Sequence, residues 1–172
     1  AEYGPFTVEA TLDGSGPRAT LVLADPLPAA GLRDVRLAIA PEGDGLAIDT
    51  SGQWLLGPFD GNGLLVMPQS APTRLAIRQL DVWRTGVSGE IVFGDSGPSG
   101  RLALAGGGID GTIALTPRGK AQAVAVNLAV NNASFAGEMP LSVRRARLEG
   151  EGLIADGQTT FTGSAYAEGL TA

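Results

Sequence analysis

Hydrophobic and polar residues alternate with a period of two along most of the chain. The clearest example is the run 121–135, where Val124, Val126, Leu128 and Val130 alternate with small or polar residues. A period of two places successive side chains on opposite faces of a β-strand. One face is larger and more apolar than the other, so the pattern predicts strands that share a single apolar surface.

Turn signals divide this alternation into separate strands. Breaks are expected where Gly, Pro, Asp and Asn cluster, because these residues favour turns or cannot pair within a sheet. The sequence predicts about ten to twelve strands and no helix. The apolar segments that make up these strands, some of them only a few residues long, are 6–12, 20–23, 35–39, 46–50, the region near Trp54, 64–67, 87–93, 141–148, 153–154 and 159–166, with three more within 101–135. Breaks are expected at 13–17, 25–28, 42–45, 57–63, 106–108 and 117–119.

Two segments have an irregular period. Residues 73–83 begin with strand spacing at Leu75, whereas Leu80 and Trp83 would share a helical face. We favour a strand with a β-bulge near Gln79, because a bulge shifts the alternation by one residue. The strand 141–148 also changes phase, among its three arginines.

The chain contains one internal echo. The turn Ser15-Gly16-Pro17, followed by apolar alternation, recurs 81 positions later as Ser96-Gly97-Pro98. Gly-rich turns can be similar by chance. The alternative interpretation is a repeated turn-and-strand unit, as in repetitive β structures.

Composition changes this picture in one respect. Hydrophobic residues make up 44% of the 172 residues but aromatic residues only 5%. The apolar mass is therefore aliphatic, which suits the lining of a long narrow interior better than a compact core of large rings. The same alternation would also fit the packed interior of a sandwich or barrel.

Charge and hydropathy exclude several classes of protein. The net charge is −6, and no basic stripe is present to displace counterions from phosphates, which argues against a nucleic-acid partner. The sequence contains no run of about 18 apolar residues, so it predicts no membrane-spanning helix. The first four residues lack the basic and apolar regions of a signal peptide. We interpret the chain, 1–172, as one segment of a longer domain.

Candidate chemistry is sparse. The chain has no histidine and no cysteine, which removes histidine-based triads and disulfides and leaves no common zinc ligand set. Gly106–Gly111 resembles one copy of a calcium-binding solenoid repeat, although a plain glycine turn explains it better. A carboxylate pair could meet across strands, as a glycosidase needs, but no pair is singled out. The sequence predicts no catalytic residue, no metal site and no cofactor, so we expect a protein that is not an enzyme.

The remaining conspicuous residues have two interpretations each. Arg144, Arg145 and Arg147 could meet anionic headgroups at a groove rim, but a solvated strand face is the simpler interpretation. Trp54 and Trp83 could anchor at an interface, and packing at a core or rim is the alternative.

Several segments, taken in order, resemble a known family. They are DPLPAAGLRDVRLAIAP (25–41), IDTSGQWLLGPFDGNG (48–63), PTRLAIRQLDVWRTGVSGEI (72–91), SGRLALAGGGIDGTIAL (99–115) and ASFAGEMPLSVRRARLEGEGLIADG (133–157). In this order they resemble the TamB family, the inner-membrane-anchored component of the translocation and assembly module, most closely its alphaproteobacterial members.

This resemblance implies a fold, a location and a function. The implied fold is a β-taco, a long antiparallel or mixed sheet curled into a U-shaped apolar trough with little or no helix, as in AsmA-like and bridge-like lipid transfer proteins. The implied location is the periplasm of a Gram-negative bacterium, with the full-length protein anchored in the inner membrane. Phospholipid transport and outer-membrane protein assembly or secretion are the implied functions. An Omp85-type outer-membrane barrel is the implied protein partner, through regions outside this segment.

Within that interpretation, the larger face of the strands would line a groove for phospholipid acyl chains. A structural β-solenoid or adhesin module, filled by its own side chains, is one alternative, and a chaperone groove for outer-membrane protein strands is another. An enzyme acting on polysaccharide would instead need clustered carboxylates in a polar cleft on the outer face. The predicted groove residues are Val8, Leu21, Leu23, Val35, Leu37, Ile39, Leu75, Ile77, Leu102, Leu104, Ile109, Ile113, Leu115, Val124, Val126, Leu128 and Val130.

Overall fold

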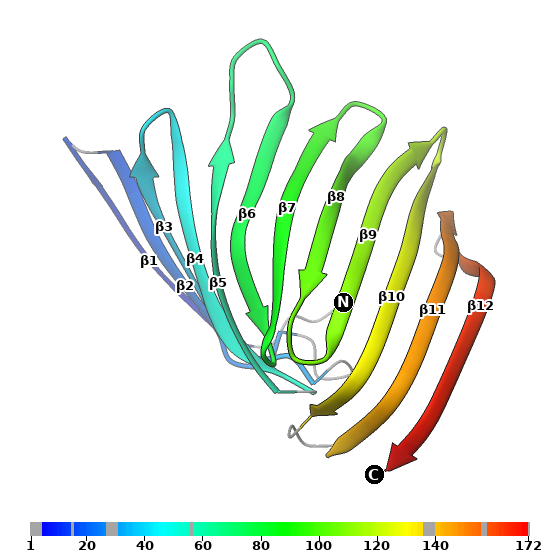
Figure 1. Ribbon diagram of the computed structural model, residues 1–172. Helices are drawn as coiled ribbons and strands as arrows, with labels where there is room; N and C mark the ends of the chain where they lie inside the picture. The colour runs from blue at the N-terminus through cyan, green and yellow to red at the C-terminus, as the bar shows by residue number, and fades with distance from the viewer. Residues whose placement is uncertain are drawn as a thin grey trace.

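The described residues form one sheet of twelve strands, each hydrogen-bonded to the next in sequence order (Figure 1). The structure is a computed structural model, and it describes residues 5–14, 16–26, 31–55, 57–135, 140–155 and 158–171. The strands are β1 (Phe6–Asp13), β2 (Gly16–Leu23), β3 (Arg33–Glu42), β4 (Gly45–Trp54), β5 (Gly57–Val66), β6 (Thr73–Val82), β7 (Thr85–Gly94), β8 (Gly97–Ala105), β9 (Ile109–Arg118), β10 (Ala121–Phe135), β11 (Leu141–Ala155) and β12 (Gln158–Thr171).

Every neighbouring pair is antiparallel. The sheet curls without closing into a barrel, so β1 and β12 lie at its two ends (Figure 1). The described residues contain no helix, so they include no helix that could cross a membrane. The all-β prediction and the predicted curled sheet are confirmed.

The sheet has almost no packed core. Among the described Ala, Val, Leu, Ile, Met and aromatic residues only Ala123, Ala133 and Val143 are buried. The chain exposes 10677 Å², whereas a compact monomer of 17.4 kDa exposes about 7,900 Å². The excess area is what a single sheet shows when no second layer of the described residues packs against it.

The predicted bulge in the segment 73–83 is confirmed. This segment is β6, and its register with β7 shifts between Ile77 and Leu80. The shift against β5 falls at the same place, between Asn62 and Gly63 of β5. Because of the extra residue, Leu80 lies on the same face of the sheet as Ile77, three positions earlier. A spacing of three is also typical of a helix, which explains the ambiguous pattern in the sequence.

The predicted break at 57–63 is wrong, because these residues form most of β5. A Cβ on Gly61 would lie 2.6 Å from the carbonyl oxygen of Gln79, and one on Gly63 would lie 2.7 Å from that of Ala76. The glycines are therefore present because β6 approaches closely, a role that the sequence alone does not distinguish from a turn.

Two other pairs of predicted strands are single strands. Residues 46–50 and the region of Trp54 belong to β4, and residues 141–148 and 153–154 belong to β11. Small residues such as Gly52 and Gly150 interrupt the apolar pattern but not the ladder of hydrogen bonds. The phase change among the β11 arginines coincides with a positive φ of 52° at Asn132 in β10.

The internal echo has a structural counterpart. Gly16 begins β2 with φ 104° and Gly97 begins β8 with φ 116°. Each glycine pairs with the last residue of the preceding strand, Gly16 with Asp13 and Gly97 with Gly94, and its left-handed backbone favours glycine. Ser15 of the echo, the first four residues, and Leu27 and Pro28 of the predicted loop lie outside the described residues.

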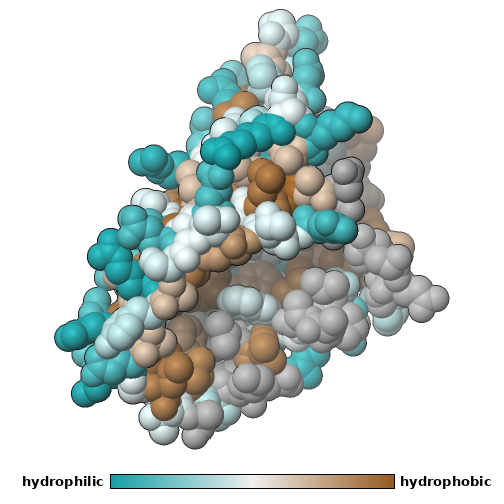
Figure 2. All heavy atoms as spheres, turned by 90° about the vertical axis from the view of Figure 1, so that its right-hand side faces the viewer, coloured by the Kyte–Doolittle hydropathy of each residue, from teal (hydrophilic) through white to brown (hydrophobic). Residues whose placement is uncertain are grey.

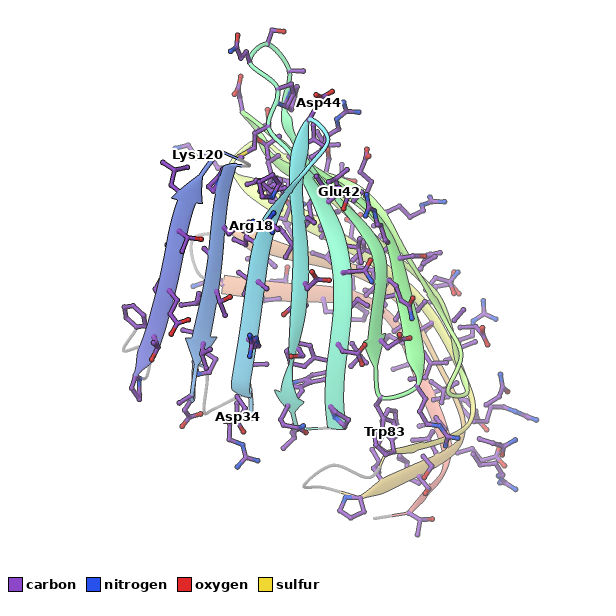
Figure 3. All side chains as sticks on the ribbon, turned by 90° about the vertical axis from the view of Figure 1, so that its left-hand side faces the viewer. Arg18, Asp34, Glu42, Asp44, Trp83 and Lys120 are labelled. Carbon is purple, nitrogen blue, oxygen red and sulfur yellow. The ribbon has the colours of Figure 1, made fainter. Side chains whose placement is uncertain are left out.

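Hydrogen bonds from Trp83 and Thr85 connect the central strands at one end of the sheet. The Trp83 indole, in the β6–β7 turn, donates a hydrogen bond to the Ser134 carbonyl of β10. Thr85 is buried beside it and donates to the Gly106 carbonyl at 3.2 Å. Figure 3 shows Trp83 and Asp34 at one end of the strands, with Asp44 and Lys120 at the opposite end. Trp83 therefore has the predicted packing role, at the rim.

The β6–β7 turn carries local backbone strain. Trp83 and Arg84 have φ values of 46° and 67°, and Val82 pairs with Thr85 across them. Two central residues at positive φ define a type I′ hairpin, which favours Asn-Gly. We expect Arg84→Gly to raise the free energy of unfolding by about 0.5–1 kcal/mol, because a left-handed backbone is costly for arginine. Urea unfolding would measure this change.

Lys120→Gly is the matched control for that measurement. Lys120 is also an exposed turn residue, between β9 and β10, but its φ is not positive. We expect this substitution to leave stability unchanged or slightly lower. An equal gain in both variants would contradict the assigned turn strain.

Candidate apolar groove

The register places apolar residues in rows that cross the whole sheet. Residues that face each other in an antiparallel pair lie on the same face. The central row therefore shares one face, which we call the apolar face. Its members are Ala10, Ala19, Ile39, Ile48, Gly63, Ile77, Gly89, Leu102, Ile113, Val126, Gly150 and Gly163.

Two flanking rows on the apolar face are equally free of charge. One runs through Val8, Leu21, Leu37, Thr50, Gly61, Leu80, Val87, Leu104, Gly111, Leu128, Leu148 and Ala165. The other runs through Pro41, Leu46, Leu65, Leu75, Ile91, Gly100, Leu115, Val124, Gly152 and Phe161.

The structure brings all of the predicted groove residues to this one face. Most stand in the three rows, and the remainder form two cross-strand pairs, Leu23 with Val35 and Ile109 with Val130. All are half-buried except Val8, which is exposed. Aliphatic side chains that are neither packed nor fully exposed are what an unfilled concave surface would show.

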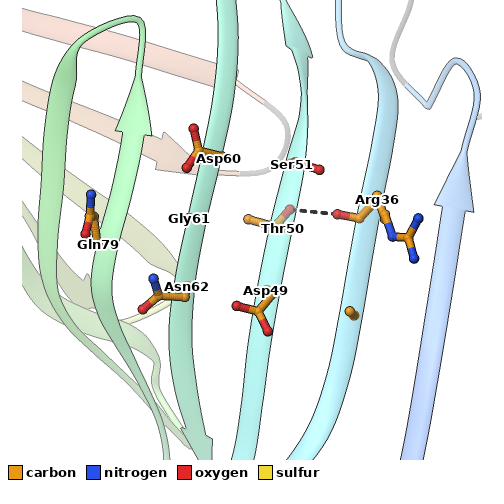
Figure 4. A pocket seen from close by; sticks show the side chains of 9 residues that line it. Arg36, Asp49, Thr50, Ser51, Asp60, Gly61, Asn62 and Gln79 are labelled. Carbon is orange, nitrogen blue, oxygen red and sulfur yellow. Dashed lines mark hydrogen bonds between the residues drawn. The ribbon is translucent and has the colours of Figure 1, made fainter.

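The apolar face lies on the inside of the curl. In Figure 4 the polar side chains of β3 to β5 face the viewer, while the faint orange and red ribbons of the C-terminal strands cross behind the sheet. Figure 2 shows apolar atoms within a hollow on the other side of the molecule, with polar side chains around the outside. Each strand contacts chiefly its two neighbours, so no described element fills this hollow.

Glycines on the apolar face shape the floor of the groove. Gly61 and Gly63 lie among Ile48, Leu75 and Ile77, and together they line an apolar depression of about 170 Å³. Missing side chains at these positions leave open space between larger aliphatic ones. The groove floor is therefore uneven rather than a flat apolar wall.

Sequence reasoning missed several members of this face, including Ile48, Leu80 and Ile91. Leu80 was obscured by the β6 bulge. Ile48 and Ile91 did have strand spacing, so a search for every apolar residue in phase with a neighbouring strand would have found them. The glycines of the apolar face could not be predicted, because a residue without a side chain does not contribute to the apolar alternation.

The opposite face is polar and carries the ion pairs. Arg118 on β9 and Glu151 on β11 lie there and form a bidentate pair with N–O distances of 2.6 and 2.8 Å. Arg147 bonds to Glu149 at 3.1 Å, and Arg144 pairs with Glu168. The Tyr166 hydroxyl also donates to Glu168, which raises the pKa of Tyr166. Two of the three clustered arginines are thus neutralised by carboxylates, which favours the solvated strand face.

One ion pair links β3 to β6 and should make stability depend on pH. The hydrogen bond from Arg78 lowers the pKa of Glu42 below its ordinary value near 4.5, and Coulombic attraction adds to this. A lowered carboxyl pKa stabilises the fold above the unfolded pKa, and that stability is lost as the pH falls through the folded pKa. We therefore expect Glu42→Gln to lower the melting temperature slightly at pH 7.

The same variant should match the parent chain at a pH below the lowered pKa of Glu42, where the parent carboxyl is also neutral. Thermal unfolding at both pH values checks this. Added salt should shrink the pH 7 difference, because both side chains are exposed. A difference that persists at low pH would show that the substitution acts through something other than charge.

The polar face also has a hollow of about 390 Å³ that bears on the enzyme hypothesis. Asp49, Asp60, Asn62 and Gln79 line it (Figure 4), and Thr50 donates to the Arg36 carbonyl beside it at 3.2 Å. The hollow is shallow and open. Among the described residues no group of three potential metal ligands forms, and Gly106–Gly108 make a plain turn between β8 and β9.

No model of a known protein family matches this chain, and neither a curated protein nor a solved structure matches it. The geometry of the apolar face and the sequence resemblance are therefore the two observations that bear on function.

Proposed function

We propose that this chain is a non-catalytic periplasmic segment of a TamB-like bridge that carries phospholipids between the inner and outer membranes. The acyl chains would move along the apolar face, while the headgroups would stay in water at the open side. The same segment would support assembly or secretion of outer-membrane proteins. An Omp85-type barrel and an inner-membrane anchor would belong to other regions of the full-length protein.

The observation that carries this proposal is the uncharged, unfilled apolar face that runs across all twelve strands. With strands about 4.8 Å apart, such a surface extends about 50 Å across the sheet. A hydrocarbon chain that leaves one membrane would find apolar contacts over this whole distance.

The energetic reason for such a surface is the cost of exposing an acyl chain to water. Each methylene costs about 0.8 kcal/mol, so a chain of about sixteen carbons costs on the order of 12 kcal/mol. Contact with leucine, isoleucine and valine side chains removes most of this barrier. Half-buried side chains without a deep pocket suit transport, because a tight site would hold the lipid instead of releasing it.

The alternative of a structural solenoid or adhesin requires an interior filled by the chain's own side chains. The described residues leave the inside of the curl without such a filling layer, which favours a groove over a solenoid core. A chaperone groove for outer-membrane strands is the second candidate, because the apolar side chains of an unfolded strand would find the same aliphatic contacts on the apolar face.

Site-specific photo-cross-linking tests the proposal. A photo-reactive residue at Val126, on the apolar face, is expected to capture phospholipid from bacterial envelopes. The same residue at Ala103, on the opposite face of β8, is expected to capture little. Mass spectrometry of the adducts would separate lipid from peptide. Peptide adducts without lipid at position 126 would favour the chaperone, and no difference between the positions would contradict both groove functions.

A further inference from the structure

Trp83 joins two strands that are not neighbours, at one end of the hollow. A Cβ on Gly57, the first residue of β5, would clash with the Trp83 ring, and the Trp83 indole donates to the Ser134 carbonyl of β10. The strands β6, β7, β8 and β9 lie between these two in the sheet. The β6–β7 and β8–β9 turns are therefore gathered between β5 and β10 at this end. We call it the narrow end and define it by residues 57, 83–85, 106–108 and 131–135.

Backbone contacts close the narrow end. A Cβ on Gly107 would lie 2.9 Å from the Thr85 hydroxyl oxygen, and one on Gly108 would lie 2.5 Å from the Asn131 carbonyl oxygen. The Asn131 amide donates to the Gly108 carbonyl at 2.7 Å. Thr85 and Ala133 are buried. The β8–β9 turn thus packs against the β6–β7 turn on one side and against β10 on the other.

Aromatic rings cover the apolar face near the narrow end. Gly57 and Phe59 lie on this face, because they are an even number of positions from Gly61. A Cβ on Gly52, which pairs with Phe59, would lie 2.6 Å from the Phe59 ring. The Phe59 and Trp83 rings therefore lie against strand backbone on the apolar side. The chain itself covers the apolar face at this end.

The opposite end of the same strands is open, and we call it the wide end. The strands fan apart towards it in Figure 1, and Figure 3 shows Asp44 and Lys120 there. A Cβ on Gly43 or Gly119, in two of its turns, would have no atom within 4 Å. Asp44, Asp95-Ser96 and Lys120 are exposed in these turns. Polar turns without packed neighbours thus border the hollow at the wide end.

The strands between the two ends are long enough to shelter an acyl chain. β5, β6, β7 and β9 have ten residues each, which is about 33 Å of extended strand. The hydrocarbon core of a bilayer is about 30 Å thick and holds two layers of acyl chains, so one chain spans about 15 Å. An acyl chain that lies along the strands therefore fits within the hollow, and its headgroup needs water at one end only.

We propose that bound phospholipid lies along the strands, with its headgroup at the wide end and its acyl chains pointing towards Trp83. The inference rests on the proposed function and deepens it, because it assigns the open side of the groove to one set of turns. A charged headgroup at the narrow end would lie against packed backbone and aromatic rings, without the water that hydrates it, which is costly. Lipids then move from strand to strand with their headgroups along the wide end. Trp83 is a positioning residue that keeps the narrow end closed.

Paramagnetic labelling tests the orientation, and the absence of cysteine allows a single label in each variant. Asp44→Cys places a nitroxide at the wide end of β4, and Gln53→Cys places one beside Pro58 at the narrow end. Both residues are exposed. The chain is loaded with phosphatidylethanolamine from vesicles, and phosphorus NMR then reports on the headgroup alone. We expect the phosphorus signal to be lost with the label at position 44 and kept with the label at position 53.

The possible outcomes separate this proposal from the proposed function. A phosphorus signal that is lost from position 53 and kept from position 44 would overturn the orientation and leave the groove function intact. Equal loss from both positions would show that the lipid has no fixed orientation, which also overturns the proposal. A chain that takes up no phosphatidylethanolamine would overturn the proposed function, and the orientation with it.

Trp83→Ala tests the closed end. Without the indole the narrow end should admit water, and we expect the phosphorus signal to weaken with the label at position 53 as well. Ser134→Ala is the matched control and should behave as the parent, because Trp83 bonds to the backbone carbonyl of residue 134. If circular dichroism shows that Trp83→Ala loses its strands, Trp83→Phe carries the test with a smaller expected change, since it keeps a ring against Gly57. An unchanged signal in the folded Trp83 variants would overturn the role assigned to Trp83.

Discussion

Val126→Asp is expected to abolish lipid passage along the groove while the chain keeps its strand content. Val126 stands in the middle of the central row, between Ile113 and Gly150, and it is half-buried. An empty groove lets water reach an aspartate there, so folding should be affected only modestly. An acyl chain that passes position 126 would have to displace the water that hydrates the aspartate.

The size of the effect follows from the cost of placing a carboxylate against hydrocarbon. This cost is about 3 kcal/mol in the centre of an apolar environment, which corresponds to a decrease on the order of a hundredfold in passage. Transfer of a fluorescent phospholipid between donor and acceptor vesicles, with the chain present, would measure it. Circular dichroism would confirm that the variant keeps its sheet.

Ala103→Asp is the matched control for this prediction. Ala103 lies in the middle of β8 on the polar face, where its cross-strand neighbours are Ser88 and Thr112. The new charge there has no acidic residue directly opposite and does not meet the groove. We expect normal transfer from this variant. Normal transfer by Val126→Asp would remove the apolar face from the transport path.

Gly111→Ala is expected to destabilise the whole sheet, since it alters the backbone contact between β9 and β10. A Cβ at this position would lie 2.1 Å from the carbonyl oxygen of Asn127, and the backbone has φ 155°. No rotation of a side chain relieves a contact between a Cβ and a neighbouring backbone. The two strands would have to separate, which weakens the ladder between Leu104 and Leu128 on either side.

We expect Gly111→Ala to lower the free energy of unfolding by about 2–4 kcal/mol, from backbone strain and lost pairing. Urea unfolding followed by circular dichroism would measure the loss. Gly14→Ala is the control, because a Cβ there has no atom within 4 Å and the φ of Gly14 is not positive. Its effect should stay within about 0.5 kcal/mol. A similar loss in both variants would show that glycine at 111 is not required by the close approach.

The predicted groove residues illustrate how far the alternation alone reaches. Residues such as Leu102 and Val126 were assigned to one face because a strand has a fixed period of two, which requires no knowledge of neighbouring strands. The register then aligned them, since a shift of one residue would have exposed the apolar set on the polar face. Whether phospholipid occupies that face is a prediction that the cross-linking experiment addresses.

The break predicted at 57–63 shows the limit of this reasoning. Glycine permits both a turn and a close approach between strands, and only the position of β6 decides between them. The sequence likewise could not show that Gly61 and Gly63 open a depression in the groove floor. For the same reason it did not reveal the contact between Trp83 and Ser134, which joins residues far apart in the chain.

The sequence by itself determined that the chain is all-β, that its strands have one apolar side, and that no histidine or cysteine chemistry is available. Strand periodicity and composition are local properties, so they can be read without coordinates. Only the tertiary structure decided the continuous register across the strands, the direction of the curl and the unfilled interior. These features arise from contacts between distant segments and from the absence of a covering layer, and neither is encoded within a single strand.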